Sequence, residues 1–249
     1  MNHAFTWVFL AALLAATGTR LWLAARQARH VRAHREAVPE SFAGAIPLAA
    51  HQKAADYTVA KTRLAMVEVC LSAALVLALT LGGLLQWLAD AWARAAPPFG
   101  IVHGVALIAS VAALLSLLEL PLTVYRTFVI EVRFGFNRMT PKLFALDLAK
   151  QTLVAAALGI PLVTLVLWLM ERTGGLWWVW VWLAWAGFNL LVLLIYPSFI
   201  APLFNKFSPL ADQGLAARIE ALLARCGFRS GGLYVMDGSK RSSHGNAYF

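Results

Sequence analysis

The sequence has few charged residues, and this scarcity excludes an ordinary soluble protein. Asp, Glu, Lys and Arg together make up 13% of the 249 residues, whereas hydrophobic residues make up 61%. Soluble globular domains contain about 25% charged residues. A chain so poor in charge cannot cover a large core with a hydrated surface, so the composition indicates a membrane protein.

Cysteine is scarce, and the common short catalytic motifs are missing from the sequence. Cys70 and Cys226 do not have the CxxC spacing of redox or zinc sites, and we interpret them as small buried apolar residues. The sequence also contains no HExxH, GxSxG, Walker or GxGxxG motif. The residues alone therefore identify no catalytic centre.

Long hydrophobic runs are the most prominent feature that is present. A membrane-spanning helix needs about 20 predominantly apolar residues. The predicted spans cover about residues 4–25, 64–89, 101–124, 152–170 and 176–196. The predicted fold class is mainly α: a polytopic membrane helix bundle over residues 1–196, followed by the start of an α+β cytoplasmic domain over residues 197–249.

Positive charge is concentrated in alternate loops. Lys and Arg are frequent in residues 26–63, in residues 126–150 and after residue 197, whereas the two other loops contain only Arg94 and Arg172. The positive-inside rule then places the N-terminus outside and the C-terminal domain in the cytoplasm. Because the net charge of +9 follows the topology, we expect membrane lipid, and not nucleic acid, as a partner. The first apolar run precedes its basic cluster, which favours a retained helix over a signal peptide.

Two carboxylates lie inside predicted spans, Glu68 in the second and Glu119 in the third. Acids within a membrane are costly and contact water or protein partners. They either line a polar cavity that opens toward the cytoplasm or pair with nearby arginines such as Arg20, Arg63 or Arg126. The cavity also suits a different function, a small transporter or channel that moves a proton or cation past these acids.

Several segments near the inner surface have predictable local structure. Residues 48–61 are expected to form a helix that continues into the second span, and Thr140-Pro141 is typical of a helix start. Asp147 and Lys150, three residues apart on that helix, are expected to pair weakly. The apolar spacing in residues 211–226 predicts an amphipathic helix.

The end of the chain has a strand pattern. Residues 233–237 are expected to form a short strand that ends in a turn, and residues 243–249 are expected to form a returning strand. His244, close to that strand, is a polar candidate for a functional role.

Four stretches, in this order along the chain, resemble the integral-membrane zinc metallopeptidases typified by the type I CAAX prenyl protease. The first contains His51, Asp56 and Tyr57, and the second contains Glu131 and the Phe134-Gly-Phe-Asn turn and continues to Asp147 and Lys150. The third and fourth are Ile200-Ala-Pro-Leu-Phe-Asn-Lys-Phe-Ser-Pro-Leu210 and Asp237-Gly-Ser-Lys-Arg-Ser-Ser-His-Gly-Asn-Ala-Tyr-Phe249. Any one of them is weakly specific, but four in order are specific.

The resemblance implies a metalloendopeptidase with seven membrane helices around a chamber and a zincin-like domain on its cytoplasmic side. It implies Zn²⁺ in the full-length protein, held by an HExxH helix and a later glutamate. The sequence contains no HExxH, so we expect no catalytic residue, no zinc ligand and no zinc bound by this chain alone. We interpret the chain as the N-terminal portion of the enzyme, truncated before the HExxH helix, with a natural inactive short form as the alternative.

Substrate binding is the one role that the resemblance carries to individual residues. It implies that Asn246 and Ala247, with His244 nearby, form a strand edge on which an extended peptide substrate pairs; an ordinary structural strand is the alternative. In eukaryotes the substrates are prenylated CAAX proteins. The Ala-, Trp- and Arg-rich sequence suggests a bacterial inner membrane, where the substrates are expected to be membrane or misfolded proteins. A membrane scaffold that binds partners through its basic loops is a third hypothesis.

Overall fold

The computed structural model describes residues 3–98, 100–228 and 230–245, and these residues are mainly helical. The chain divides into two compact units, Met1–Asn137 and Arg138–Phe249, which are described separately. Within the described residues, five helical segments are long and apolar enough to span a membrane: Ala4–Ala33, Leu48–Thr80, Ile101–Arg133, Pro141–Arg172 and Gly174–Phe204. The predicted mainly α class with five membrane-length helices is confirmed.

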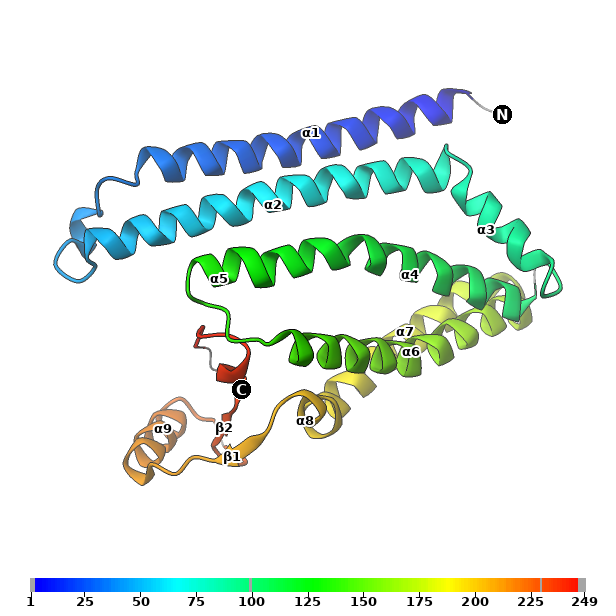
Figure 1. Ribbon diagram of the computed structural model, residues 1–249. Helices are drawn as coiled ribbons and strands as arrows, with labels where there is room; N and C mark the ends of the chain where they lie inside the picture. Colours follow the sequence, from blue (N-terminus) through cyan, green and yellow to red (C-terminus); the bar gives the residue numbers. More distant parts are fainter. Residues whose placement is uncertain (1–2, 99, 229, 246–249) are drawn as a thin grey trace. The chain divides into compact units, whose positions relative to one another are not determined.

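The first unit is built on two long neighbouring helices, α1 (His3–Ala33) and α2 (Leu48–Thr80), which run antiparallel (Figure 1). The short 3₁₀ helix η1 (Glu40–Phe42) lies in their connection. The predicted helix over residues 48–61 is confirmed, and it continues without a break into the membrane-length segment. At 1.5 Å per residue, the 33 residues of α2 extend about 50 Å, farther than the roughly 30 Å of hydrocarbon in a bilayer.

Helix α2 ends earlier than the predicted span of residues 64–89. Gly83 adopts a positive φ of 73°, a backbone conformation that is strained for residues with a side chain, and the helix stops before it. A separate helix, α3 (Leu84–Ala93), follows the break. The apolar residues 84–89 therefore belong to a second, shorter helix, which hydropathy alone does not distinguish from a continuation of α2.

The third membrane-length segment combines three helical elements, α4 (Ile101–Tyr125), the π-helical turn η2 (Arg126–Ile130) and α5 (Glu131–Arg133). Pro121 lies inside α4. Leu64 of α2 packs with Ile130 and Phe134 in the small buried core of this unit. The core lies at the end of α4–α5 that carries the second motif.

The second unit begins with α6 (Pro141–Arg172). Thr140 caps it, since its hydroxyl accepts a hydrogen bond from the Leu143 N–H at 3.2 Å, which confirms the predicted helix start. After α6, the chain forms η3 (Gly174–Leu176), α7 (Trp177–Ile195), the π-helical turn η4 (Tyr196–Ile200) and α8 (Ala201–Phe204).

The segment after α8 contains a two-stranded antiparallel sheet. Strand β1 (Phe207–Pro209) pairs with β2 (Tyr234–Met236), with Ser208 opposite Val235. Helix α9 (Gln213–Arg225) lies between them, and the 3₁₀ helix η5 (Gly238–Lys240) follows β2. The predicted amphipathic helix and the strand over residues 233–237 are confirmed. The predicted returning strand over residues 243–249 extends into residues 246–249, which lie outside the described residues.

The interpretation of Cys70 and Cys226 as buried residues is wrong, because both are exposed. Large apolar side chains are exposed along the helices as well, including Leu193 at 71% and Leu194 at 74%. Helices that cross a bilayer turn apolar side chains outward, because lipid tails are as apolar as a protein core. Apolar character therefore does not predict burial within these helices.

Candidate functional site

The first two motifs meet in the first unit, around Tyr57 of α2. The Tyr57 hydroxyl donates a hydrogen bond to Glu131 Oε1 at 2.5 Å. Its ring packs against Phe134 and Phe136, with ring centroids 5.3 Å and 4.9 Å away. The Lys53 ammonium lies 5.3 Å from the centroid of the Phe136 ring. The aromatic turn after α5 is therefore fixed on the first third of α2.

The rest of the first motif holds the end of α1. Arg35 Nε and Nη2 each donate to one carboxylate oxygen of Asp56 at 2.9 Å. Hydrogen bonds to Asp56 and then to Glu36 raise the pKa of Arg35. The ring Nε2 of His51 lies 2.8 Å from the carbonyl oxygen of His34. In this first motif, His51 and Asp56 therefore join α1 to α2.

The two intramembrane acids do not form one shared polar site. Glu68 pairs with Arg126, one of the arginines considered as its partner. Glu119 is exposed on α4, and no ion pair to it is found among the described residues. For Glu68 the predicted pairing with an arginine is confirmed. One of the two acids of the hypothetical proton or cation path is therefore occupied by an ion pair.

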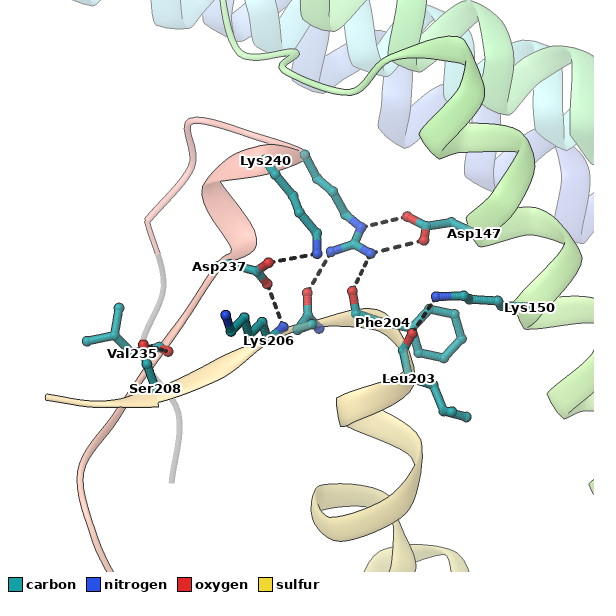
Figure 2. Close-up of polar contacts among 11 residues, drawn as sticks. Asp147, Lys150, Leu203, Phe204, Lys206, Ser208, Val235, Asp237 and Lys240 are labelled. Atoms are coloured by element: carbon teal, nitrogen blue, oxygen red, sulfur yellow. Dashed lines mark hydrogen bonds and ion pairs between the residues drawn. The ribbon is translucent and has the colours of Figure 1, made fainter.

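In the second unit, the third and fourth motifs meet α6 at a single arginine. Arg241 Nε and Nη2 donate to the two carboxylate oxygens of Asp147 at 2.6 and 3.0 Å. Its Nη1 donates to Asn205 Oδ1, and Nη2 also donates to the Phe204 carbonyl, each at 2.6 Å. Figure 2 shows the contacts of Asp147 and Phe204 converging on this guanidinium. We call these four residues the Arg241 clamp.

The Arg241 clamp contains a buried charge. Asp147 is 4% exposed, and no other charged side chain is buried within the part of the chain that the structure describes. Burying a carboxylate is costly unless a cation and hydrogen bonds replace its water. The forked guanidinium of Arg241 supplies both the positive charge and the hydrogen bonds. Its hydrogen bonds to Asp147 raise the pKa of Arg241.

A second set of contacts surrounds the Arg241 clamp. Asp237 accepts hydrogen bonds from the Lys240 ammonium and the Lys206 N–H, both at 2.8 Å, and these contacts lower the pKa of Asp237 (Figure 2). Lys150 donates to the Leu203 carbonyl at 2.7 Å. The expected Asp147–Lys150 pair is wrong, because Asp147 contacts Arg241 instead.

Two cationic side chains, one on α6 and one after η5, satisfy backbone carbonyls at the end of α8. The last carbonyls of a helix have no partners within the helix and need donors from elsewhere. Lys150 supplies one donor to Leu203, and Arg241 supplies another to Phe204. Three segments that are distant in sequence are thereby joined: α6, the end of α8 and the residues just before His244.

The predicted substrate-binding residues are only partly within the described chain. Asn246 and Ala247 lie outside the described residues. His244 is described, and its backbone N–H donates to Ser242 Oγ at 3.2 Å. Arg241 lies three residues before His244, and no local sequence pattern around it predicts a role for this residue. The available signal was a lone carboxylate, Asp147, near the start of an apolar helix, which requires a cation.

The described residues do not provide a zinc site. Among them, no group of three or more His, Cys, Asp or Glu side chains is placed to hold a metal ion. The full sequence also has no HExxH motif.

Comparison with known proteins identifies the family. Residues 27–206 match the family described as CAAX prenyl protease N-terminal, five membrane helices. The chain belongs to this CAAX prenyl protease family. It is 33% identical to CAAX prenyl protease 1 homolog of Arabidopsis thaliana over 217 residues, which cover 85% of this chain and 51% of the relative. It is 44% identical to CAAX prenyl protease 1 of Saccharomyces cerevisiae over 140 residues, covering 55% and 30% of the two chains.

A solved member of the family shares the fold. The crystal structure of S. mikatae Ste24p superposes with a TM-score of 0.88 at 29% sequence identity, covering 96% of this chain and 57% of that one. The resemblance drawn from the four motifs is therefore confirmed at the level of the family. The chain spans about half the length of the first of these relatives, since it covers 51% of the Arabidopsis protein.

Proposed function

We propose that this chain is the membrane and substrate-holding portion of a zinc metalloendopeptidase that cleaves CAAX proteins at the cytoplasmic side of an intramembrane chamber. The Arg241 clamp is the observation that carries this proposal. It fixes the chain just before His244, Asn246 and Ala247 to the membrane-length helix α6, through Asp147 at 2.6 Å. The family match and the Ste24p fold support the same assignment.

The substrate is held by strand addition in this proposal. An extended peptide pairs its backbone with an exposed strand edge, and the side chains on that edge set its register. Asn246 and Ala247 form this edge, with His244 beside it. Asn246 follows Arg241 by only five positions in the sequence. The Arg241 clamp therefore limits where the peptide backbone is presented.

The zinc ion belongs to the complete enzyme in this proposal. When bound, it polarises the scissile carbonyl and activates water for peptide hydrolysis. Its ligands lie outside the residues described here, and the contribution of this chain is to bind and orient the substrate. The chain alone is then expected to be inactive.

The proposed location is a multi-pass position in a bacterial inner membrane, with the N-terminus outside and the domain after residue 196 in the cytoplasm. The division at residue 196 remains a prediction from hydropathy. The charge pattern supports this orientation, because Lys and Arg are frequent in the loops that become cytoplasmic. The substrate class proposed is a prenylated C-terminal peptide, with unprenylated membrane or misfolded proteins as the alternative in a bacterial setting.

The transporter or channel is not favoured. It depended on Glu68 and Glu119 forming a polar path, but Glu68 is ion-paired with Arg126. It also leaves the contacts among the four motifs without a purpose, since an ion path does not need a clamp such as the one at Arg241.

Photo-crosslinking tests the proposed substrate site. A farnesylated CAAX peptide with a photoreactive residue in its last four positions should label the purified chain within residues 242–249. Trypsin releases this segment as one peptide, because Arg241 is the last Lys or Arg in the sequence. Excess unlabelled peptide should abolish the label, and a scrambled peptide should not. Competed labelling confined to other segments would contradict the proposed strand edge.

A further inference from the structure

The end of α1 carries positive charge that ion pairs among the described residues do not neutralise. Helix α1 contains no Asp or Glu along its whole length, yet it includes Arg26, Arg29 and Arg32. Among the described residues, the ion pairs near this end both involve Arg35, with Glu36 and Asp56. The three other arginines are exposed. This end of the helix therefore presents a positive field that can attract an anion from outside the chain.

Helix geometry places two of these arginines on one outward face with a tryptophan. Trp22, Arg26 and Arg29 are spaced i, i+4 and i+7, which puts them on one side of an α-helix. Ala28, which is buried, marks the side of α1 that packs against α2. At about 100° per residue, the two sides lie roughly 130° apart. We call Trp22, Arg26 and Arg29 the Trp22 stripe.

The Trp22 stripe has the features of a membrane interface. It lies where the apolar run of residues 4–25 gives way to basic residues. Trp22 is 54% exposed, and the Arg26 guanidinium carbon lies 5.6 Å from the centroid of its ring. Tryptophan is enriched at the level of lipid headgroups, and a ring face stabilises a nearby guanidinium. The contact keeps Arg26 at the boundary of the apolar segment.

We propose that the Trp22 stripe is a binding site for an anionic phospholipid, whose phosphate is shared by Arg26 and Arg29. Side chains three residues apart on a helix have Cβ atoms about 5–6 Å apart, close enough for two guanidinium groups to contact one phosphate. The apolar surface of α1 before Trp22 receives the acyl chains. A soluble anion does not use this apolar surface, so the occupant is a lipid.

Lipid retention by the purified full chain tests the proposal. The chain is held in neutral detergent micelles and mixed with equal amounts of phosphatidylglycerol and phosphatidylcholine with identical acyl chains. Bound lipid is then counted by native mass spectrometry. The unmodified chain should retain phosphatidylglycerol preferentially. Each cation near an anionic surface contributes about fivefold to binding, so Arg26→Gln combined with Arg29→Gln should weaken phosphatidylglycerol retention about 30-fold.

A charge-matched control separates a site from general electrostatics. Arg94→Gln combined with Arg172→Gln removes the same net charge from the ends of α3 and α6, outside the Trp22 stripe, and should change retention less than twofold. Arg26→Lys combined with Arg29→Lys keeps the charge but loses the fork, and should give an intermediate loss. Thermal unfolding of each variant confirms that it is folded.

The proposal would be overturned by equal retention of the two lipids, by equal loss in the control pair, or by unchanged retention in both the Gln and Lys variants. Displacement of phosphatidylglycerol by excess inorganic phosphate alone would also reject it, because the site would then bind a soluble anion.

Discussion

Asp147→Ala is expected to destabilise the second unit by about 3–5 kcal/mol, the cost of leaving one partner of a buried ion pair unpaired. The Arg241 side chain is 19% exposed and would lose the acceptor of two of its hydrogen bonds. Segments 203–206 and 237–245 should then detach from α6. Hydrogen exchange of the purified chain in micelles should become much faster in these segments, and its thermal unfolding midpoint should fall.

Two further variants test whether the clamp itself is responsible. Lys150→Ala, on the same helix as Asp147, removes a single hydrogen bond to the Leu203 carbonyl of α8 and should cost about 1 kcal/mol. The double variant Asp147→Leu with Arg241→Leu removes both charges and should be less destabilised than the sum of the two single variants. An Asp147→Ala chain with unchanged exchange in segment 237–245 would show that the clamp holds nothing in place.

Asn246→Ala is expected to reduce cleavage by the complete enzyme about 10- to 100-fold in kcat/KM, which corresponds to roughly 1.4–2.7 kcal/mol of transition-state stabilisation. The reason is the proposed role of this residue on the strand edge that aligns the peptide. Zinc content should stay unchanged, because this side chain is not proposed to hold the metal. The two quantities are measured on the same purified sample.

Ser242→Ala is the matched control for Asn246→Ala. It lies in the same segment, and among the described residues its hydroxyl accepts a local hydrogen bond from the His244 N–H. We expect a less than threefold effect on cleavage. If Asn246→Ala instead lowers zinc content in proportion to activity, Asn246 has a structural role and the strand-edge assignment is wrong.

Local features of the fold were predictable from the sequence because neighbouring residues produce them. The cap at Thr140, the start of α2 at Leu48 and the amphipathic helix α9 each depend on the chemistry of a few adjacent residues. The break at Gly83 was missed because the residues on both sides are equally apolar. Hydropathy measures transfer into lipid, and it carries little information about the direction of the helix axis.

The contacts that build the candidate site were less predictable. Asp147 and Arg241 are 94 positions apart in the sequence. The residues around each of them do not predict the other as its partner. The three-residue strand β1 ends in Pro209, which lacks a backbone N–H and so resembles a loop in sequence. The resemblance placed all these residues in motifs. Helix spacing suggested that Asp147 pairs with Lys150, but Asp147 instead forms two hydrogen bonds with the distant Arg241.

The central claim is that this chain supplies the substrate-holding portion of a CAAX-type protease. A chimera tests it most directly: residues 1–249 replace the part of S. mikatae Ste24p with which they superpose, 57% of that chain. Cleavage of a farnesylated CAAX peptide and zinc content are measured together. We expect a chimera that contains zinc, cleaves the peptide, and loses this activity when Asp147→Ala is introduced. A chimera that folds and retains zinc but cleaves nothing would contradict it.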